Sequence, residues 1–111
     1  HVVTKELISA AMMPLVLSVL ARGESYGYDI IRNVKELSKG ELDVGEGTLY
    51  PLLRKLEERN LIESEWRQAE NDRQRKYYRL KDQGHATLEV ERRNWIAINQ
   101  LLQTLWTPSL T

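Results

Sequence analysis

The stretch Leu61–Leu80, LIESEWRQAENDRQRKYYRL, decides the fold, because its apolar residues are spaced differently from those before it. Two segments, 61–67 and 74–80, alternate loosely between apolar and polar residues, as half-buried strands do. Both contain residues that favour strands: Ile62, Trp66, Tyr77 and Tyr78. The polar segment 68–73 between them is typical of a turn. We therefore predict a β-hairpin with a fairly long loop.

The residues before the hairpin have the apolar spacing of helices. Residues 5–21 place their apolar side chains on one helical face, and Pro14 within them either kinks the helix or marks a helix start. A second helix is expected over residues 25–38, with Ser25 as a favourable N-cap. We therefore predict two helices before the segment that leads into the hairpin, residues 45–60.

The third predicted helix carries leucines on one side and polar residues on the other. It starts near Gly47, which places Pro51 in the first turn, where backbone N–H groups have no partner inside the helix. The inward face is formed by Leu49, Leu52, Leu53 and Leu56. The opposite flank is formed by Thr48, Tyr50, Arg54 and Lys55. One flank is therefore available for contacts outside the fold.

The last third of the chain is predicted to be one long helix, from Asp82, a plausible N-cap, to Leu105. Its apolar residues follow a heptad pattern that Glu91 interrupts once. The residues of this seam are Leu88, Trp95, Ile98, Leu102 and Leu105. Such a seam is typical of a helix that pairs with another helix, so we predict that it forms a dimer interface.

Length and composition place the chain among compact globular domains. With 111 residues, 41% of them hydrophobic and 29% charged, it is expected to form one unit, in which residues 1–81 precede a dimerisation helix at 82–111. No apolar run is long enough for a membrane span and no signal segment is evident, so we expect a cytoplasmic protein without a membrane partner. There is no cysteine, no metal-ligand spacing and no nucleophile with a base, so we expect neither cofactor nor enzyme activity.

The distribution of charge matters more than its sum, which is zero. A neutral net charge counts mildly against nucleic-acid binding. However, one segment of seven residues carries four cations and no acid: Arg73, Arg75, Lys76 and Arg79. We expect this segment to give the hairpin a basic face.

Three helices followed by a two-stranded hairpin is the element order of a winged helix-turn-helix, so we predict a mainly α fold with a hairpin, an α+β class. In this fold the third helix enters the major groove of DNA. Thr48, Tyr50, Arg54 and Lys55 are then the candidate groove contacts. The hairpin, or wing, offers Arg73, Arg75 and Lys76 to the phosphate backbone or the minor groove. Tyr77 and Tyr78 point to opposite faces, and we assign Tyr78 as a further DNA contact.

Several ordered motifs resemble the PadR family of transcriptional regulators. They are Tyr26-Gly27-Tyr28-Asp29-Ile30, Glu46-Gly47-Thr48-Leu49-Tyr50-Pro51, Leu56-Glu57-Glu58, Leu61-Ile62 and Arg75-Lys76-Tyr77-Tyr78-Arg79-Leu80. The resemblance covers about residues 7–106. It implies a homodimer held by the first and last helices. It also implies that the protein represses nearby genes, often genes for drug efflux or phenolic-acid detoxification, and that a small molecule relieves this repression.

The sequence departs from the family pattern in three places. Asn71-Asp72 stands before Arg73 where Gly-Gly is usual, although Asn and Asp tolerate turn geometry. Gly45 stands where a Ser or Asn cap is common. Pro14 is unusual in the first helix and puts the shape of the dimer interface there in question.

Trp95 has two interpretations. Glu91 and Asn99 lie one turn to either side of it on the same helical face. It either packs in the dimer interface or, as the resemblance implies for some members, stacks against a planar aromatic ligand between two subunits. First-helix residues would then complete the site: Leu7, Ala10 and Met13. Glu91 would favour a cationic ligand.

Two functions remain open. The first is a DNA-binding regulator, a homodimeric repressor that binds double-stranded DNA and is relieved by a small aromatic effector. The alternative is a winged-helix module that binds a protein partner instead of DNA. The acid-free basic segment of the wing favours DNA. We expect Trp66 to pack in the core or within the hairpin rather than to bind, and His85 to be a surface residue.

Overall fold

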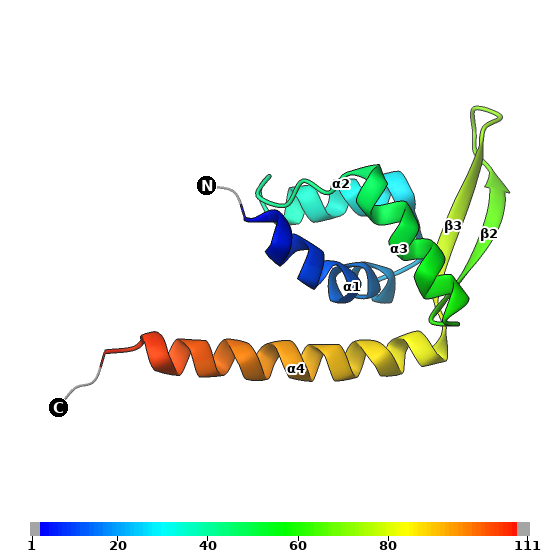
Figure 1. The fold of residues 1–111 in the computed structure, drawn as a ribbon. Coiled ribbons are helices and arrows are strands. Elements are labelled where there is room, and N and C mark those ends of the chain that lie inside the picture. The colour runs from blue at the N-terminus through cyan, green and yellow to red at the C-terminus, as the bar shows by residue number, and fades with distance from the viewer. Residues whose placement is uncertain (1–2, 109–111) are drawn as a thin grey trace.

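The computed structural model describes residues 3–108 and has the predicted element order, with one short strand added (Figure 1). The helices are α1 (Lys5–Ala21), α2 (Gly27–Leu37), α3 (Glu46–Glu58) and α4 (Asp82–Trp106). The strands are β1 (Ser25–Tyr26), β2 (Ile62–Gln68) and β3 (Gln74–Leu80). Helices α1 to α3 gather together, the β2–β3 hairpin stands beside them, and α4 extends as a long arm (Figure 1). The predicted α+β class is confirmed.

Strand β1 is the element that the sequence does not predict, because two residues carry no periodic signal. It pairs antiparallel with β3, so the sheet order is β1-β3-β2. The prediction that Ser25 caps α2 is wrong: α2 begins at Gly27, and its N-cap residue, Tyr26, makes no side-chain capping bond. Ser25 is buried in the sheet, and its hydroxyl donates to Asp29 Oδ2 at 3.2 Å.

Two prolines lie inside helices. Helix α1 continues through Pro14, so Pro14 marks no helix start. Helix α3 begins at Glu46, with Gly45 as N-cap, so Pro51 lies in the second turn and the prediction of a first-turn proline is wrong. A proline at this position cannot donate to the backbone carbonyl four residues earlier.

The core forms where the first three helices meet the sheet. Its fully buried side chains come from α1, α2, α3 and β2: Val16, Leu17, Ile30, Leu49, Leu53, Leu56 and Ile62. Because the α3 leucines face this core, the polar flank of α3 faces solvent, as the sequence predicts. Packing of these leucines therefore sets the direction in which the candidate DNA contacts point.

The hairpin turn has the geometry that its sequence permits. Asp72 adopts a φ of 61°, in the left-handed region that Asn and Asp tolerate better than most residues. Its backbone N–H donates to the Ala69 carbonyl at 3.1 Å, and the Ala69 N–H donates to the Arg73 carbonyl at 2.6 Å. The absence of Gly-Gly therefore does not prevent a closed turn.

Helix α4 touches the body of the molecule closely at its start. Its N-cap residue is Lys81, so the assignment of Asp82 as cap is wrong by one residue. Gly84 is buried, and a Cβ atom at this position would lie 2.1 Å from the Leu61 carbonyl oxygen. Only a residue without a side chain permits this approach. Gly84 therefore fixes where α4 leaves the wing.

Beyond this contact, much of the apolar surface of α4 is exposed. The exposed side chains are Val90, Trp95, Ile96, Ile98, Leu101, Leu102, Leu105 and Trp106. The molecule measures 66 × 31 × 21 Å, and α4 forms its long dimension (Figure 1). In the described part of the chain, no helix combines the length and the apolar character that a membrane crossing needs.

Candidate nucleic-acid interface

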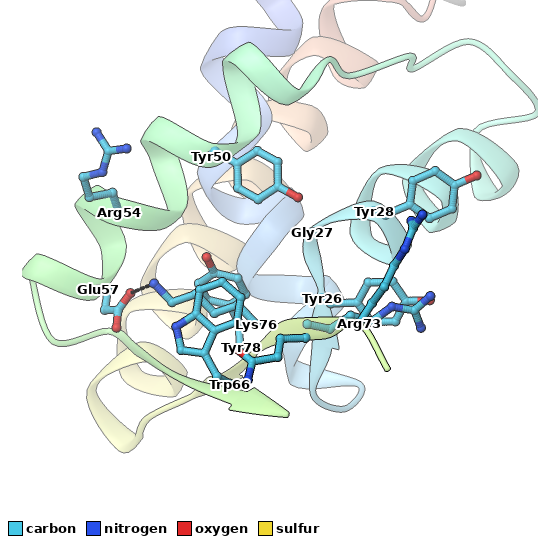
Figure 2. A pocket seen from close by; sticks show the side chains of 12 residues that line it. Tyr26, Gly27, Tyr28, Tyr50, Arg54, Glu57, Trp66, Arg73, Lys76 and Tyr78 are labelled. Atoms are coloured by element: carbon cyan, nitrogen blue, oxygen red, sulfur yellow. Dashed lines mark ion pairs between the residues drawn. The ribbon is translucent and has the colours of Figure 1, made fainter. Parts of the chain in front are cut away.

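Helix α3 presents its predicted contact residues to solvent. Thr48, Tyr50, Arg54 and Lys55 are all exposed, on the side of the helix away from its buried leucines. Tyr50 is 39% exposed, and its ring lies against Gly27 at the start of α2, where an added Cβ would meet the Tyr50 hydroxyl at 2.4 Å (Figure 2). Burial of this ring, with a smaller effect of the nearby Glu46 carboxylate, raises the pKa of the Tyr50 hydroxyl.

The register of the hairpin divides its side chains between two faces. Directly opposed residues in an antiparallel pair lie on the same face, and successive residues alternate between faces. One face carries the pairs Ser64–Tyr78, Trp66–Lys76 and Gln68–Gln74. The Ser64 hydroxyl donates to Glu57 of α3 at 2.6 Å, so this face looks toward α3. We call it the inner face and the opposite one the outer face.

A groove of about 690 Å³ separates the inner face from α3 and the start of α2 (Figure 2). It is lined by aromatic rings and basic groups with a single carboxylate: Tyr26, Gly27, Tyr28, Tyr50, Arg54, Glu57, Trp66, Arg73, Gln74, Arg75, Lys76 and Tyr78. Six of the predicted DNA contacts thus border one groove. Thr48 and Lys55 are not part of this lining and lie elsewhere on the exposed side of α3.

Lys76 is held in the middle of the groove. Its ammonium lies 3.8 Å from Glu57 Oε1, 5.8 Å from the Trp66 ring centre and 5.7 Å from the Tyr78 ring centre (Figure 2). Glu57 also accepts the hydrogen bond from Ser64. These contacts hold the Lys76 ammonium in place before any ligand binds. The Glu57 carboxylate already balances part of its positive charge.

Tyr78 is the inward member of the tyrosine pair, and Tyr77 lies on the outer face. Only 5% of Tyr78 is exposed, and burial raises the pKa of its hydroxyl. Tyr78 therefore belongs mainly to the core, and only its edge borders the groove. Its assigned contact with DNA stays a prediction.

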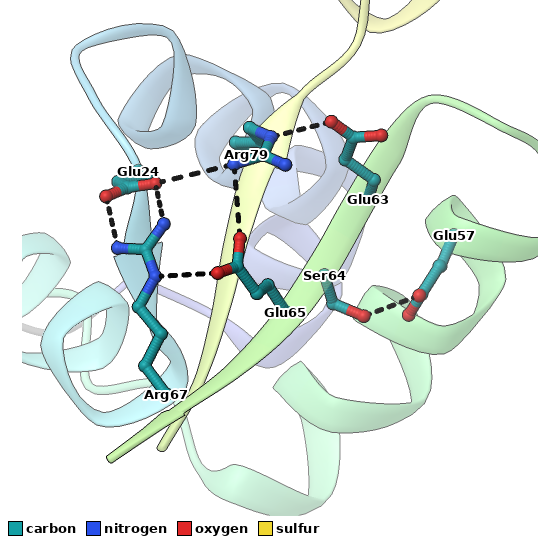
Figure 3. Close-up of polar contacts among 7 residues, drawn as sticks. All are labelled: Glu24, Glu57, Glu63, Ser64, Glu65, Arg67 and Arg79. Carbon is teal, nitrogen blue, oxygen red and sulfur yellow. Dashed lines mark hydrogen bonds and ion pairs between the residues drawn. The ribbon is translucent and has the colours of Figure 1, made fainter. Parts of the chain in front are cut away.

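The outer face carries a network of ion pairs (Figure 3). Arg67 forms a two-pronged contact with Glu24, at 2.5 and 2.8 Å, and contacts Glu65 at 3.4 Å. Arg79 lies 2.6 Å from Glu63, 3.6 Å from Glu65 and 3.9 Å from Glu24. The Arg67 and Arg79 hydrogen bonds lower the pKa values of the Glu24 and Glu63 carboxyls, respectively. The network ties both wing strands to the loop before β1.

The four cations of the acid-free segment are therefore not equivalent. Arg79 is engaged by three carboxylates, and Lys76 by one. Arg75 lies over the Tyr26 ring, 4.4 Å from its centre. Arg73, at the exposed tip of the wing, has no carboxylate within ion-pair distance among residues 3–108. The absence of acids in the local sequence does not make the whole segment a free basic face.

Trp66 lines the groove, although the sequence analysis did not name it as a site residue. The expectation that it packs in the core is wrong, since 62% of the residue is exposed, and within the hairpin its ring meets Lys76 of the paired strand. Its place opposite Lys76 on the inner face directs it into the groove. The alternation of strand residues places Trp66 on the same face as Ser64 and Gln68. It does not show that this face borders α3, because that depends on how the hairpin packs against the helices.

Comparison with known proteins identifies the family. The family model "Transcriptional regulator PadR-like family" matches residues 16–90. The chain belongs to the PadR-like family. The matched segment includes the C-terminal end of α1, all of α2, α3 and the wing, and the beginning of α4. This PadR-like protein is thus a DNA-binding transcriptional regulator and not an enzyme, as the sequence predicts.

Individual relatives agree with this assignment. The transcriptional regulator YqjI of Escherichia coli is 32% identical over 78 residues, which cover 70% of this chain and 36% of that relative. The structure of a transcriptional regulator from Clostridium thermocellum is 25% identical with a TM-score of 0.85, over 96% of this chain and 100% of that one. A PadR family transcriptional regulator from Eggerthella lenta is 36% identical with a TM-score of 0.72, over 93% and 88% of the two chains.

The residues predicted for a dimer and a ligand lie on α1 and α4. On α4, Trp95 is 37% exposed and Asn99 is also exposed, with Glu91 half-buried. On α1, Leu7 and Ala10 are exposed and Met13 is half-buried. Leu88 packs against the core, whereas the other four seam residues are exposed: Trp95, Ile98, Leu102 and Leu105. His85 is exposed as expected, and residues 3–108 contain no His, Cys, Asp and Glu cluster that could hold a metal ion.

Proposed function

We propose that this PadR-like protein is a homodimeric repressor that binds operator DNA through α3 and the inner face of the wing. The groove between these two elements carries the proposal, because it joins exposed donors of the helix to cations of the wing. With α3 in the major groove, Thr48 and Tyr50 near the helix start would donate to phosphates, and Arg54 and Lys55 would reach phosphates or base edges. Arg73 and Arg75 would contact the backbone beside the neighbouring groove.

The exposed seam of α4 supports the homodimer. An apolar stripe of this extent is unfavourable in water, and pairing of two copies would cover it. We expect Leu102→Asp to convert the dimer to a monomer, because it places a charge in the centre of the seam. Gln100→Asp is the matched control, since it puts the same charge on an exposed polar position of the same helix.

Sedimentation velocity of both variants tests the dimer. The proposal predicts a dimer for the native chain and the control, and a monomer for Leu102→Asp. A native monomer at micromolar concentration, or a Leu102→Asp dimer, would contradict it. Repression is tested by a reporter gene placed behind the DNA that the protein protects from nuclease. Reporter output that rises with the amount of protein would exclude repression.

We place the effector, a planar aromatic compound, between the Trp95 side chains of two subunits. The exposed Trp95 ring, with Asn99 and the Glu91 carboxylate beside it, supports this location. Leu7, Ala10 and Met13 of α1 would complete the walls, and Glu91 would favour a cation. Trp95→Phe is expected to abolish most quenching of tryptophan fluorescence by a planar cationic dye, whereas Trp66→Phe is expected to retain it. Full quenching in Trp95→Phe would exclude Trp95 as the stacking residue.

The alternative function, a protein-interaction module, makes a different prediction. Phosphate contacts release counterions, so DNA binding through the groove must weaken steeply as salt rises. A gel shift at two salt concentrations distinguishes the functions. Absence of any DNA complex at low salt would favour the interaction module. A transcription regulator must reach the chromosome, and this requirement agrees with the expected cytoplasmic location.

A further inference from the structure

Trp66 is an exposed indole inside the groove that the helix–wing arrangement forms. It lies on the inner face near the middle of β2, two residues beyond Ser64, which is bonded to α3, and before the hairpin tip. With 62% of its surface exposed, it contributes little to the core. Across the strand, the Lys76 ammonium lies 5.8 Å from its ring centre and thereby limits the positions that the ring can take (Figure 2).

The geometry of a duplex determines what passes this position. The major groove admits α3, and the wing tip reaches the backbone or the adjacent minor groove. These two grooves are separated by one sugar-phosphate strand. That strand must therefore cross the space between α3 and the wing, which is the groove lined by Trp66, Lys76 and Tyr50.

We propose that Trp66 is a DNA-contacting residue that packs its ring against the deoxyribose of this strand and donates its indole N–H to a phosphate. The inference rests on the proposed DNA binding and adds a residue to it. An indole has a large apolar surface for the sugar and one donor for the phosphate. Lys76 provides a positive charge beside the Trp66 ring, and its contact with Glu57 holds the ammonium there.

Fluorescence tests the contact because each tryptophan can be removed separately. We compare the native chain with Trp66→Phe and with the matched control Trp106→Phe, since Trp106 is 67% exposed but lies at the far end of α4. The probe is a short duplex of random sequence at low salt, where non-specific binding dominates. Acrylamide quenching is measured with and without this duplex, together with the affinity from a gel shift.

We expect DNA to protect the native chain and Trp106→Phe from acrylamide, and to protect Trp66→Phe little or not at all. Trp66→Ala is expected to weaken binding about tenfold without changing the slope of affinity against salt, since it removes apolar contact and no charge. Its melting temperature should stay close to that of the native chain, because the ring is mostly exposed. A structural role would instead lower the melting temperature.

Three results would overturn the inference. Equal DNA protection in Trp66→Phe and the native chain would show that the strand does not cover Trp66. Native affinity in Trp66→Ala would remove its role in binding. A Trp66 already shielded from acrylamide without DNA would indicate that a second copy of the chain covers it. If the native chain itself forms no complex with DNA, the proposed function fails as well, and the gel shift distinguishes that outcome from the other three.

Discussion

On the inner face of the wing, Lys76 stands among aromatic rings with one carboxylate, Glu57, within ion-pair distance. On the outer face, Arg67 and Arg79 share the carboxylates of Glu24 and Glu65, and Arg79 also contacts Glu63 (Figure 3). Both faces belong to strands β2 and β3, whose successive residues point alternately to one face and to the other. The comparison teaches that a cation's availability for DNA depends on the carboxylates that packing brings to it, and that Arg67 and Arg79 serve to hold the wing in place.

The largest expected effect comes from the helix side of the groove. Arg54→Ala should weaken DNA binding by about 1–3 kcal/mol, because Arg54 is an exposed donor on α3 at the groove. Fluorescence anisotropy with a labelled duplex measures the affinity. Arg67→Ala, the same substitution on the outer face, should leave the affinity nearly unchanged. Equal losses in the two variants would remove the distinction between the faces.

Removal of the inner carboxylate should strengthen binding. Glu57→Gln keeps an oxygen that can accept the Ser64 hydrogen bond but releases Lys76 from its ion pair. We expect DNA affinity to rise about two- to fivefold and its salt dependence to steepen, since one more cation can meet phosphate. Glu63→Gln is the control on the outer face. An unchanged or lower affinity in Glu57→Gln would mean that the ion pair orients Lys76 for DNA.

The smallest effect is expected in the pH dependence of stability. The pKa of the Glu24 carboxyl is lowered in the folded chain by the Arg67 hydrogen bond, from an ordinary value of 4.5. The folded state therefore favours the ionised form, and this contribution to stability is present above pH 4.5 and is lost as the pH falls through the lowered pKa. Thermal melting at about pH 7 and about pH 3 should show a smaller acid-induced decrease for Glu24→Gln than for the native chain.

Equal acid-induced decreases in the two proteins would show that Glu24 contributes nothing to the folded state. The same variant should bind DNA as the native chain does at neutral pH, because its carboxylate lies on the outer face. A change in affinity would mean that the outer network controls the angle of the wing.

Local patterns predict most of this fold. The leucines of α3 repeat with a helical period, and the loosely alternating residues of β2 and β3 define the hairpin, so both elements follow from neighbours in the sequence. Strand β1 does not, because Ser25 and Tyr26 become a strand only by pairing with Tyr77 and Tyr78. The Ser25 side chain, a good N-cap by type, is then used within the sheet and bonds to Asp29.

The candidate site was predicted less completely, for a related physical reason. The segment 73–79 contains no acid, yet Arg79 meets Glu63, which is 16 residues away, and Arg67 on the neighbouring strand meets Glu24, which is 43 residues away. The sequence shows which residues carry charge, but the register and the packing decide which charges meet. The same information decides that Trp66 faces α3 and that Tyr78 is buried.

The salt dependence of DNA affinity in Arg73→Ala and Arg79→Ala tests the central claim most directly. Arg73 has no carboxylate within ion-pair distance in the described part of the chain, whereas Arg79 has three. A plot of the logarithm of affinity against the logarithm of salt concentration should lose about one unit of slope in Arg73→Ala. In Arg79→Ala it should keep the native slope. An equal loss of slope in both variants, or a loss in Arg79→Ala alone, would contradict the account.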